Sequence, residues 1–151
     1  MGNVRLSPMC KALALAFALL VLAQAGEARG AEWVKYASTP DGEFFYDKQS
    51  IHYFSPKVLR LWERTLFSKK AKDEIIAQFK EDIPNIVQLE YERSLVDFDC
   101  VNKKKRVYLF ERKNKDDEDL HREFSMYYQW DPIPPGSRSE KLLTILCVEN
   151  K

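Results

Sequence analysis

The sequence predicts one domain of the α+β class, built on an antiparallel sheet with a C-terminal helix packed on one face and a short inserted helix. Short runs rich in Val, Tyr, Phe and Trp, separated by turn residues, fill most of the chain from residue 32 to 130. One segment with helical periodicity interrupts them, and a helix-capping motif precedes an apolar stretch near the end. A chain of 151 residues has room for one such domain.

The first 25 residues have the pattern of a cleavable export signal. Arg5 and Lys11 are the only charged residues before position 27, and an unbroken apolar run fills positions 12–23. Ala23 and Ala25 supply the small side chains that a signal peptidase accepts, and positions 28–30 offer a second cleavage site. The apolar run would rise about 18 Å as a helix, against a hydrocarbon core of roughly 30 Å. We therefore expect a signal peptide at residues 1–25, a mature domain at 26–151, and no membrane span after cleavage.

The charge balance limits the partners of the mature domain. The whole chain has 24 Lys and Arg against 23 Asp and Glu, and loss of the signal leaves 22 basic and 23 acidic side chains, formally −1. Nucleic-acid binding requires a net basic face, and adsorption to anionic membranes requires excess positive charge. The charge balance therefore favours neither nucleic acid nor an anionic membrane as a partner. The expected export signal predicts a location in the periplasm, outside the cell or at the cell surface.

The chain up to residue 88 predicts four strands and a helix. Residues 32–37 and 43–47 form a hairpin, because Pro40 and Gly42 occupy positions i+1 and i+3 of a type I turn. Strands at 50–54 and 58–67 follow. Residues 69–80 predict the inserted helix, which Pro84 ends. Its apolar face comprises Ala71, Ile75, Ile76 and Phe79.

The second half predicts three strands and the C-terminal helix. The strands are expected at 89–100, 107–112 and 122–130, with turns at 102–105 and 113–119. Residues 131–136 contain three prolines and cannot lie centrally in a sheet. Ser137 and Glu140 form a capping box for a helix over 137–149. Its apolar face comprises Leu142, Leu143, Ile145 and Leu146.

Two of the three cysteines remain after the signal is removed. Cys10 leaves with the signal, and it precedes the apolar run rather than following it, so no lipid attachment site is expected. Cys100 and Cys147 remain, and an oxidising compartment favours a disulfide between them. Closing a loop of this length stabilises a fold by about 4 kcal/mol on the chain-entropy model. The alternative is two separate buried thiols.

An ordered set of short motifs resembles the surface-adhesin protein E domain of secreted bacterial proteins. The set comprises Trp33, Tyr46-Asp47 with Ser50-Ile51, Val58 with Trp62, Asp99-Cys100, Trp130 with the proline-rich segment 132–137, and Cys147. It extends over about 115 residues, nearly the whole mature domain.

The resemblance implies an antiparallel sheet of about six strands with a C-terminal helix packed on it, and a Cys100–Cys147 disulfide. It also implies a tendency to form homodimers and, for the founding members, display at the cell surface and binding of host extracellular proteins. The chain departs from the pattern in two ways. It lacks a lipoprotein cysteine, and it inserts the charged segment 68–88.

Residues that commonly bind metals or catalyse reactions are sparse. Asp97 and Asp99 lie two apart on a predicted strand, where they could share a cation, but a solvated strand face is the favoured interpretation. His52 and His121 are the only histidines, too few for a zinc site, and no nucleophile has a base paired with it. We expect no metal, no cofactor and no enzymatic activity.

Charged turns and aromatic residues are the remaining candidates for binding. A basic run lies at one predicted turn and an acidic run, residues 116–119, at the next, so the two belong at opposite ends of the sheet. The basic run could dock a protein partner, or it could simply make the turn soluble. It comprises Lys103, Lys104, Lys105 and Arg106. The aromatic residues could form a binding platform, but we expect the tryptophans, Trp33, Trp62 and Trp130, to fill the core.

These observations predict an exported binding or interaction domain, and the resemblance suggests an adhesin that recognises extracellular proteins at the cell surface. The alternative is an accessory protein or small-ligand carrier in the periplasm, and an enzyme is the third choice. An exposed aromatic patch beside the basic turn would favour adhesion. A closed apolar pocket between helix and sheet would favour ligand carriage.

Overall fold

One antiparallel sheet of eight strands organises the part of the chain that the computed structural model describes, residues 30–125 and 129–148. The predicted signal peptide lies outside these described residues, as do positions 126–128 of the predicted last strand. Residues 1–30 and 31–151 are two separate units, and every described helix and strand belongs to the second.

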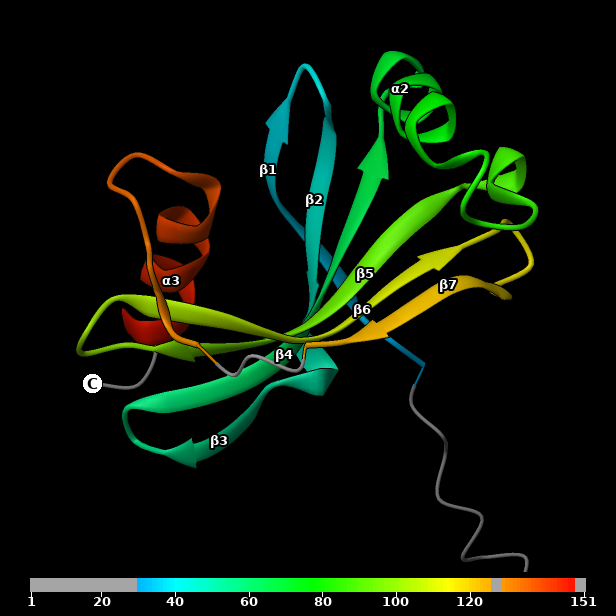
Figure 1. Cartoon of the computed structure of the whole chain (residues 1–151). Coiled ribbons are helices and arrows are strands. Elements are labelled where there is room, and N and C mark those ends of the chain that lie inside the picture. The colour runs from blue at the N-terminus through cyan, green and yellow to red at the C-terminus, as the bar shows by residue number, and fades with distance from the viewer. Residues whose placement is uncertain (1–29, 126–128, 149–151) are drawn as a thin grey trace, which may run out of the picture. The chain divides into compact units, whose positions relative to one another are not determined.

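The elements follow the predicted order (Figure 1). The strands are β1 (Trp33–Thr39), β2 (Gly42–Asp47), β3 (His52–Ser55), β4 (Val58–Phe67), β5 (Tyr91–Asp99), β6 (Lys104–Lys113), β7 (Asp119–Phe124) and β8 (Asp131–Pro132). The α-helices are α2 (Lys69–Phe79) and α3 (Arg138–Val148), and short 3₁₀ turns are η1 (Lys48–Ser50) and η2 (Ile86–Gln88).

The sheet is a meander whose strands lie in the order β1-β2-β4-β5-β6-β7, with every pairing antiparallel. Two short strands complete it. β3 pairs with the start of β4, beyond the end of β2, and β8 pairs with the start of β6. The predicted fold class is confirmed, and the path of six strands agrees with the number that the resemblance implied.

The main hydrophobic core lies between the sheet and α3. Leu59 and Leu61 of β4 lie opposite Phe98 and Val96 of β5, and all four side chains are at most 1% exposed. They pack against the predicted apolar face of α3, in which Leu142, Leu143 and Leu146 are buried and Ile145 is partly buried. Burying each such aliphatic side chain stabilises the fold by roughly 1.5–3 kcal/mol.

Ser137 caps α3, as predicted, but the return hydrogen bond to the Glu140 carboxylate comes from the Gly136 backbone rather than from the Ser137 backbone. The Glu140 backbone N–H donates to Ser137 Oγ at 3.2 Å. In return the Glu140 carboxylate accepts a hydrogen bond from the Gly136 backbone N–H at 2.7 Å. The helix therefore begins at a fixed point directly after the proline-rich segment, and this places its apolar face on the sheet.

A second, smaller cluster lies under α2. Ser68 caps the helix, accepting a hydrogen bond from the Ala71 backbone N–H at 3.3 Å. No residue of α2 is fully buried, but Ile75, Ile76 and Phe79 of its predicted apolar face pack against a buried cluster. That cluster comprises Ile83, Ile86 and Leu89. The insertion thus carries a small hydrophobic cluster of its own.

Gly42 is required where the β1–β2 hairpin meets β4. A Cβ atom added there would lie 2.2 Å from the Leu66 carbonyl oxygen, far inside van der Waals contact. The backbone of β2 can therefore approach β4 closely only with glycine at this position.

Two strands begin three residues earlier than predicted, and the strand expected at 122–130 ends at Phe124. β6 begins at Lys104 rather than at residue 107, because the preceding turn is tight and Lys104 already pairs with Asp99. β7 begins at Asp119 rather than at residue 122, where Asp119 pairs with Lys113 of β6. Charged residues that resemble turn sequence thus belong to paired strands.

Candidate functional site

The four basic residues predicted to bind a partner do not form one patch. Lys103 lies in the β5–β6 turn with φ of 50°, and Lys104 is exposed at the start of β6. Lys105 and Arg106 follow on the strand, so their side chains leave opposite faces of the sheet. The Lys105 Nζ donates to the Ser139 hydroxyl of α3 at 2.8 Å, whereas Arg106 lies on the face away from α3.

Asp97 binds Arg106 and is fully buried, so the predicted solvated strand face is wrong at this position. Its carboxylate accepts from Arg60 Nε at 2.6 Å and from Arg106 Nε at 2.8 Å. The two arginines come from the strands on either side and cover the aspartate. A buried carboxylate needs such pairing, so these three residues have a structural role.

Asp99 closes the β5–β6 turn instead of sharing a cation with Asp97. Its carboxylate accepts hydrogen bonds from the backbone N–H groups of Val101 and Asn102 at 3.0 and 2.9 Å. Slight burial opposes ionisation, but these hydrogen bonds outweigh it and hold the pKa of Asp99 below its usual value. The turn that carries Lys103 is therefore well ordered.

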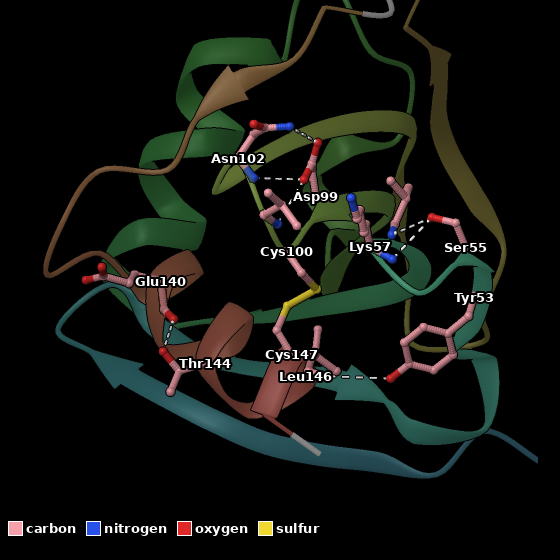
Figure 2. The surroundings of a disulfide bond; sticks show 12 residues. Tyr53, Ser55, Lys57, Asp99, Cys100, Asn102, Glu140, Thr144, Leu146 and Cys147 are labelled. Atoms are coloured by element: carbon pink, nitrogen blue, oxygen red, sulfur yellow. Dashed lines mark hydrogen bonds between the residues drawn. A yellow bond between two sulfur atoms is a disulfide. The ribbon is translucent and has the colours of Figure 1, made fainter. Parts of the chain in front are cut away.

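A disulfide joins this turn to α3 (Figure 2). Cys100 directly follows β5, Cys147 lies in the last turn of α3, and their Cα atoms are 5.7 Å apart. The predicted disulfide is confirmed. The β3–β4 turn lies beside it, because the Cys100 backbone N–H donates to the Lys57 carbonyl oxygen at 2.8 Å.

Three lysines gather at this end of the sheet. Lys57 in the β3–β4 turn joins Lys103 and Lys104 at the β5–β6 hairpin, and we call these three residues the basic end. All three are exposed, and within residues 30–125 and 129–148 none forms an ion pair. Sequence analysis missed Lys57, because only the register of β4 with β5 brings it to the same end.

Exposed apolar side chains accompany the basic end. Val101, in the same turn as Lys103, is 59% exposed. Phe54 and Tyr53 of the adjacent β3 are 54% and 40% exposed, and the Tyr53 hydroxyl donates to the Leu146 carbonyl oxygen of α3 at 3.5 Å. Tyr53 faces α3 whereas Phe54 contacts His52 and Arg60 on the other face, so the two rings do not form one aromatic patch beside the Lys103 turn.

The acidic run lies at the other end of β6, as predicted, but its charges are largely paired. Asp119 is 2.6 Å from the Lys113 Nζ and 2.9 Å from Arg122. Glu118 accepts from the Asn114 side chain at 2.7 Å, and Asp117 accepts a short hydrogen bond from the Tyr91 hydroxyl. This end offers less uncompensated charge to a partner than the basic end does.

The two histidines lie apart. His52 on β3 contacts the edge of the Phe54 ring, with centroids 4.9 Å apart. His121 on β7 is 3.7 Å from Glu123. Across the described residues no group of three or more His, Cys, Asp and Glu is placed to hold a metal ion.

The tryptophans are not in the core, so that prediction is wrong. Trp33, Trp62 and Trp130 are partly buried, and each stacks under an arginine. The arginines are Arg64, Arg93 and Arg106, at 4.4, 4.9 and 4.5 Å from the rings. These pairs lie on the face away from α3, since Arg64 alternates with the core residues of β4. The α3 interface instead consists mainly of aliphatic residues.

A cavity of about 210 Å³ lies on the helix-covered face, with Arg138 of α3 at its edge. It is lined by Glu63, Glu92 and Lys105 as well as by aromatic rings, so it is not the closed apolar pocket expected of a hydrophobic-ligand carrier. Burial raises the pKa of Glu92, although a hydrogen bond from Arg112 at 3.2 Å opposes the rise. This site could not be predicted, because its residues come from five strands and a helix.

The family model of surface-adhesin protein E matches residues 33–148, nearly all of the described unit. The chain belongs to the surface-adhesin protein E family. The resemblance seen in the sequence is thereby confirmed. No curated protein matches the chain at a significant level.

Membership of this family suggests a non-enzymatic surface adhesin, and it implies an exported protein at the cell surface. In the described part of the chain, no helix has the length and apolar character needed to cross a membrane. The basic end is the candidate binding surface of this domain, because its exposed lysines lie at turns beside the disulfide.

Proposed function

We propose that this surface-adhesin protein E domain is exported with loss of residues 1–25 and binds an extracellular protein through the basic end. The observation that carries this proposal is the group of three unpaired lysines beside a disulfide, with exposed Val101 and Phe54 nearby. Positive charge speeds encounter with an acidic partner, and exposed apolar side chains supply contact area once the partner is bound.

The arrangement supports binding because the surface is held in place. Asp99 and the disulfide fix the β5–β6 turn, and the Lys57 carbonyl group ties the neighbouring turn to it. A partner that binds an ordered surface loses less free energy to the ordering of loops. Of the predicted basic run, we propose contact roles for Lys103 and Lys104. Lys105 and Arg106 are held by Ser139 and Asp97.

The first test concerns location. Intact cells that express the full chain are treated with added protease, and the domain is followed by immunoblotting against a cytoplasmic control protein. We expect cleavage of the domain while the control survives. Protection of the domain in intact cells, with cleavage after the envelope is opened, would contradict display at the surface.

The second test concerns binding. The purified mature domain is passed over a panel of immobilised extracellular-matrix proteins at low and high salt. We expect saturable binding to at least one protein that weakens as the ionic strength rises, because salt screens the lysines. Binding to none of them at low salt would contradict the adhesin proposal. Sedimentation of the same sample tests the proposed homodimer.

A further inference from the structure

The cavity lies between the two hydrophobic clusters of the helix-covered face. Along β4, alternate side chains on this face belong first to the α3 core, then to the cavity, and then to the α2 cluster. In order they are Leu59, Leu61, Glu63, Thr65 and Phe67. Neighbouring strands follow the same pattern, since Glu63 and Thr65 lie opposite Ser94 and Glu92 of β5. The polar stretch therefore interrupts an otherwise apolar layer.

The acidic side of this cavity has capacity to accept hydrogen bonds from a ligand. Glu63 accepts from the Tyr36 hydroxyl at 2.6 Å, but among the described residues it has no cationic partner. A carboxylate offers about four lone-pair sites, so one hydrogen bond leaves most of them open. Glu92 differs, because Arg112 already pairs with it.

The basic side has two cations that form no ion pair in the described residues, although Arg138 interacts electrostatically with Glu92 and opposes the rise in its pKa. Lys105 donates to a neutral hydroxyl, that of Ser139. The Arg138 guanidinium stacks over the Phe44 ring, with its carbon 4.1 Å from the ring centroid. Neither cation forms an ion pair with any residue that the structure describes. One small cavity thus presents unpaired charge of both signs.

We propose that this cavity binds a free α-amino acid, with its carboxylate on Lys105 and Arg138 and its ammonium on Glu63. A zwitterion satisfies both sets of charges at once, whereas a simple anion or cation satisfies only one. The volume of about 210 Å³ equals that of roughly seven water molecules, which suits a small ligand. The walls formed by Phe44, Val107 and Phe110 suit an apolar side chain.

Small-ligand carriage was the alternative function predicted from the sequence, and the cavity specifies an amino acid as the ligand. It does not depend on adhesion, because the basic end and the cavity use different side chains. Failure of either proposal leaves the other standing.

The experiment uses the purified mature domain with L-alanine, L-valine and L-phenylalanine as probes, followed by saturation-transfer NMR and calorimetry. For L-valine, isobutylamine lacks the carboxylate and 3-methylbutanoate lacks the ammonium. We expect L-valine to bind and each analogue to bind roughly tenfold or more weakly, because each loses its charged hydrogen bonds. No binding by any of the three amino acids at millimolar concentration, or equal binding by the analogues, would overturn the proposal.

Variants then test the assigned residues. R138Q should weaken L-valine binding roughly tenfold, while K141Q, at an exposed site on the same helix, should leave it unchanged. E63Q should weaken the binding of L-valine and of isobutylamine but not the binding of 3-methylbutanoate. Thermal unfolding of each variant shows whether it is folded. If a folded E63Q variant binds all three ligands more weakly by the same factor, the assignment of the ammonium to Glu63 would be contradicted.

Discussion

The two helices cover the same face of the sheet but hold its two ends in different ways. α3 buries Leu142, Leu143 and Leu146 at no more than 4% exposure, and a disulfide fixes its last turn. α2 has no fully buried residue and packs only through partly buried side chains. Because stabilisation follows the apolar area removed from water, the α3 end should unfold only with the whole domain, and the α2 end should open locally.

The two ends also differ in how they use charge. On α2, Lys69 is 2.6 Å from Asp73, and Lys70 is 3.8 Å from Glu74, each one helical turn away. At the α3 end the lysines of the basic end have no such partners in the described structure. The α3 end therefore has lysines that form no ion pair, although the Asp99 carboxylate interacts electrostatically with Lys104, whereas Lys69 and Lys70 of α2 are paired. This difference favours the α3 end as the binding surface.

Removal of the disulfide should have the largest effect on this comparison. Replacing Cys100 and Cys147 together by alanine should lower the free energy of unfolding by about 4 kcal/mol, because the unfolded chain is no longer cross-linked. Urea unfolding of the mature domain measures the change. Identical midpoints for the oxidised wild type and the double variant would show that the α3 end does not depend on its covalent link.

Truncation of one aliphatic side chain on each helix should lower the free energy of unfolding by unequal amounts. Leu142→Ala removes a fully buried side chain and should cost about 3 kcal/mol, whereas Ile76→Ala on α2 should cost about 1 kcal/mol. The two substitutions are matched in the number of carbons removed. Equal losses in urea unfolding would contradict the proposed difference between the ends.

Loss of the Asp99 carboxylate should have an effect as small as that of the substitution on α2. Asp99→Ala removes the hydrogen bonds that close the β5–β6 turn and should cost about 1 kcal/mol at neutral pH. The folded pKa of Asp99 lies below its ordinary value of about 3.9, so its contribution is present above that pH and is lost as the pH falls through the folded pKa. Unfolding curves of the wild type and the variant should therefore converge in acid. If the difference in unfolding free energy between wild type and variant persists or widens in acid, the ionised carboxylate is not the source of the stabilisation.

Local patterns in the sequence predicted most elements of the fold. The capping box at Ser137 located α3 within one residue, and Pro40 with Gly42 located the first hairpin. Both signals act over a few neighbouring residues, so they can be recognised without knowledge of the tertiary structure. The disulfide was predictable because removal of the expected signal would leave only two cysteines.

The features that sequence analysis missed depend on contacts across strands. Asp97 alternates with the apolar residues Val96 and Phe98 as an exposed residue would, and only the arginines on the adjacent strands bury it. The tryptophans looked like core residues because of their size, yet strand alternation puts them on the other face, where arginines stack on their rings. The cavity and the place of Lys57 in the basic end likewise follow from strand register, which no single segment specifies.

We propose that the lysines of the basic end bind the partner, and charge reversal tests this role most directly. A variant with Lys57, Lys103 and Lys104 all changed to Glu is compared with a control in which Lys70, Lys80 and Lys115 are changed in the same way. Binding to the matrix protein that retains the wild type is measured across a range of salt concentrations. We predict a loss of roughly tenfold or more and a flatter salt dependence for the basic-end variant only. Equal losses in both variants, or none in the first, would contradict the claim.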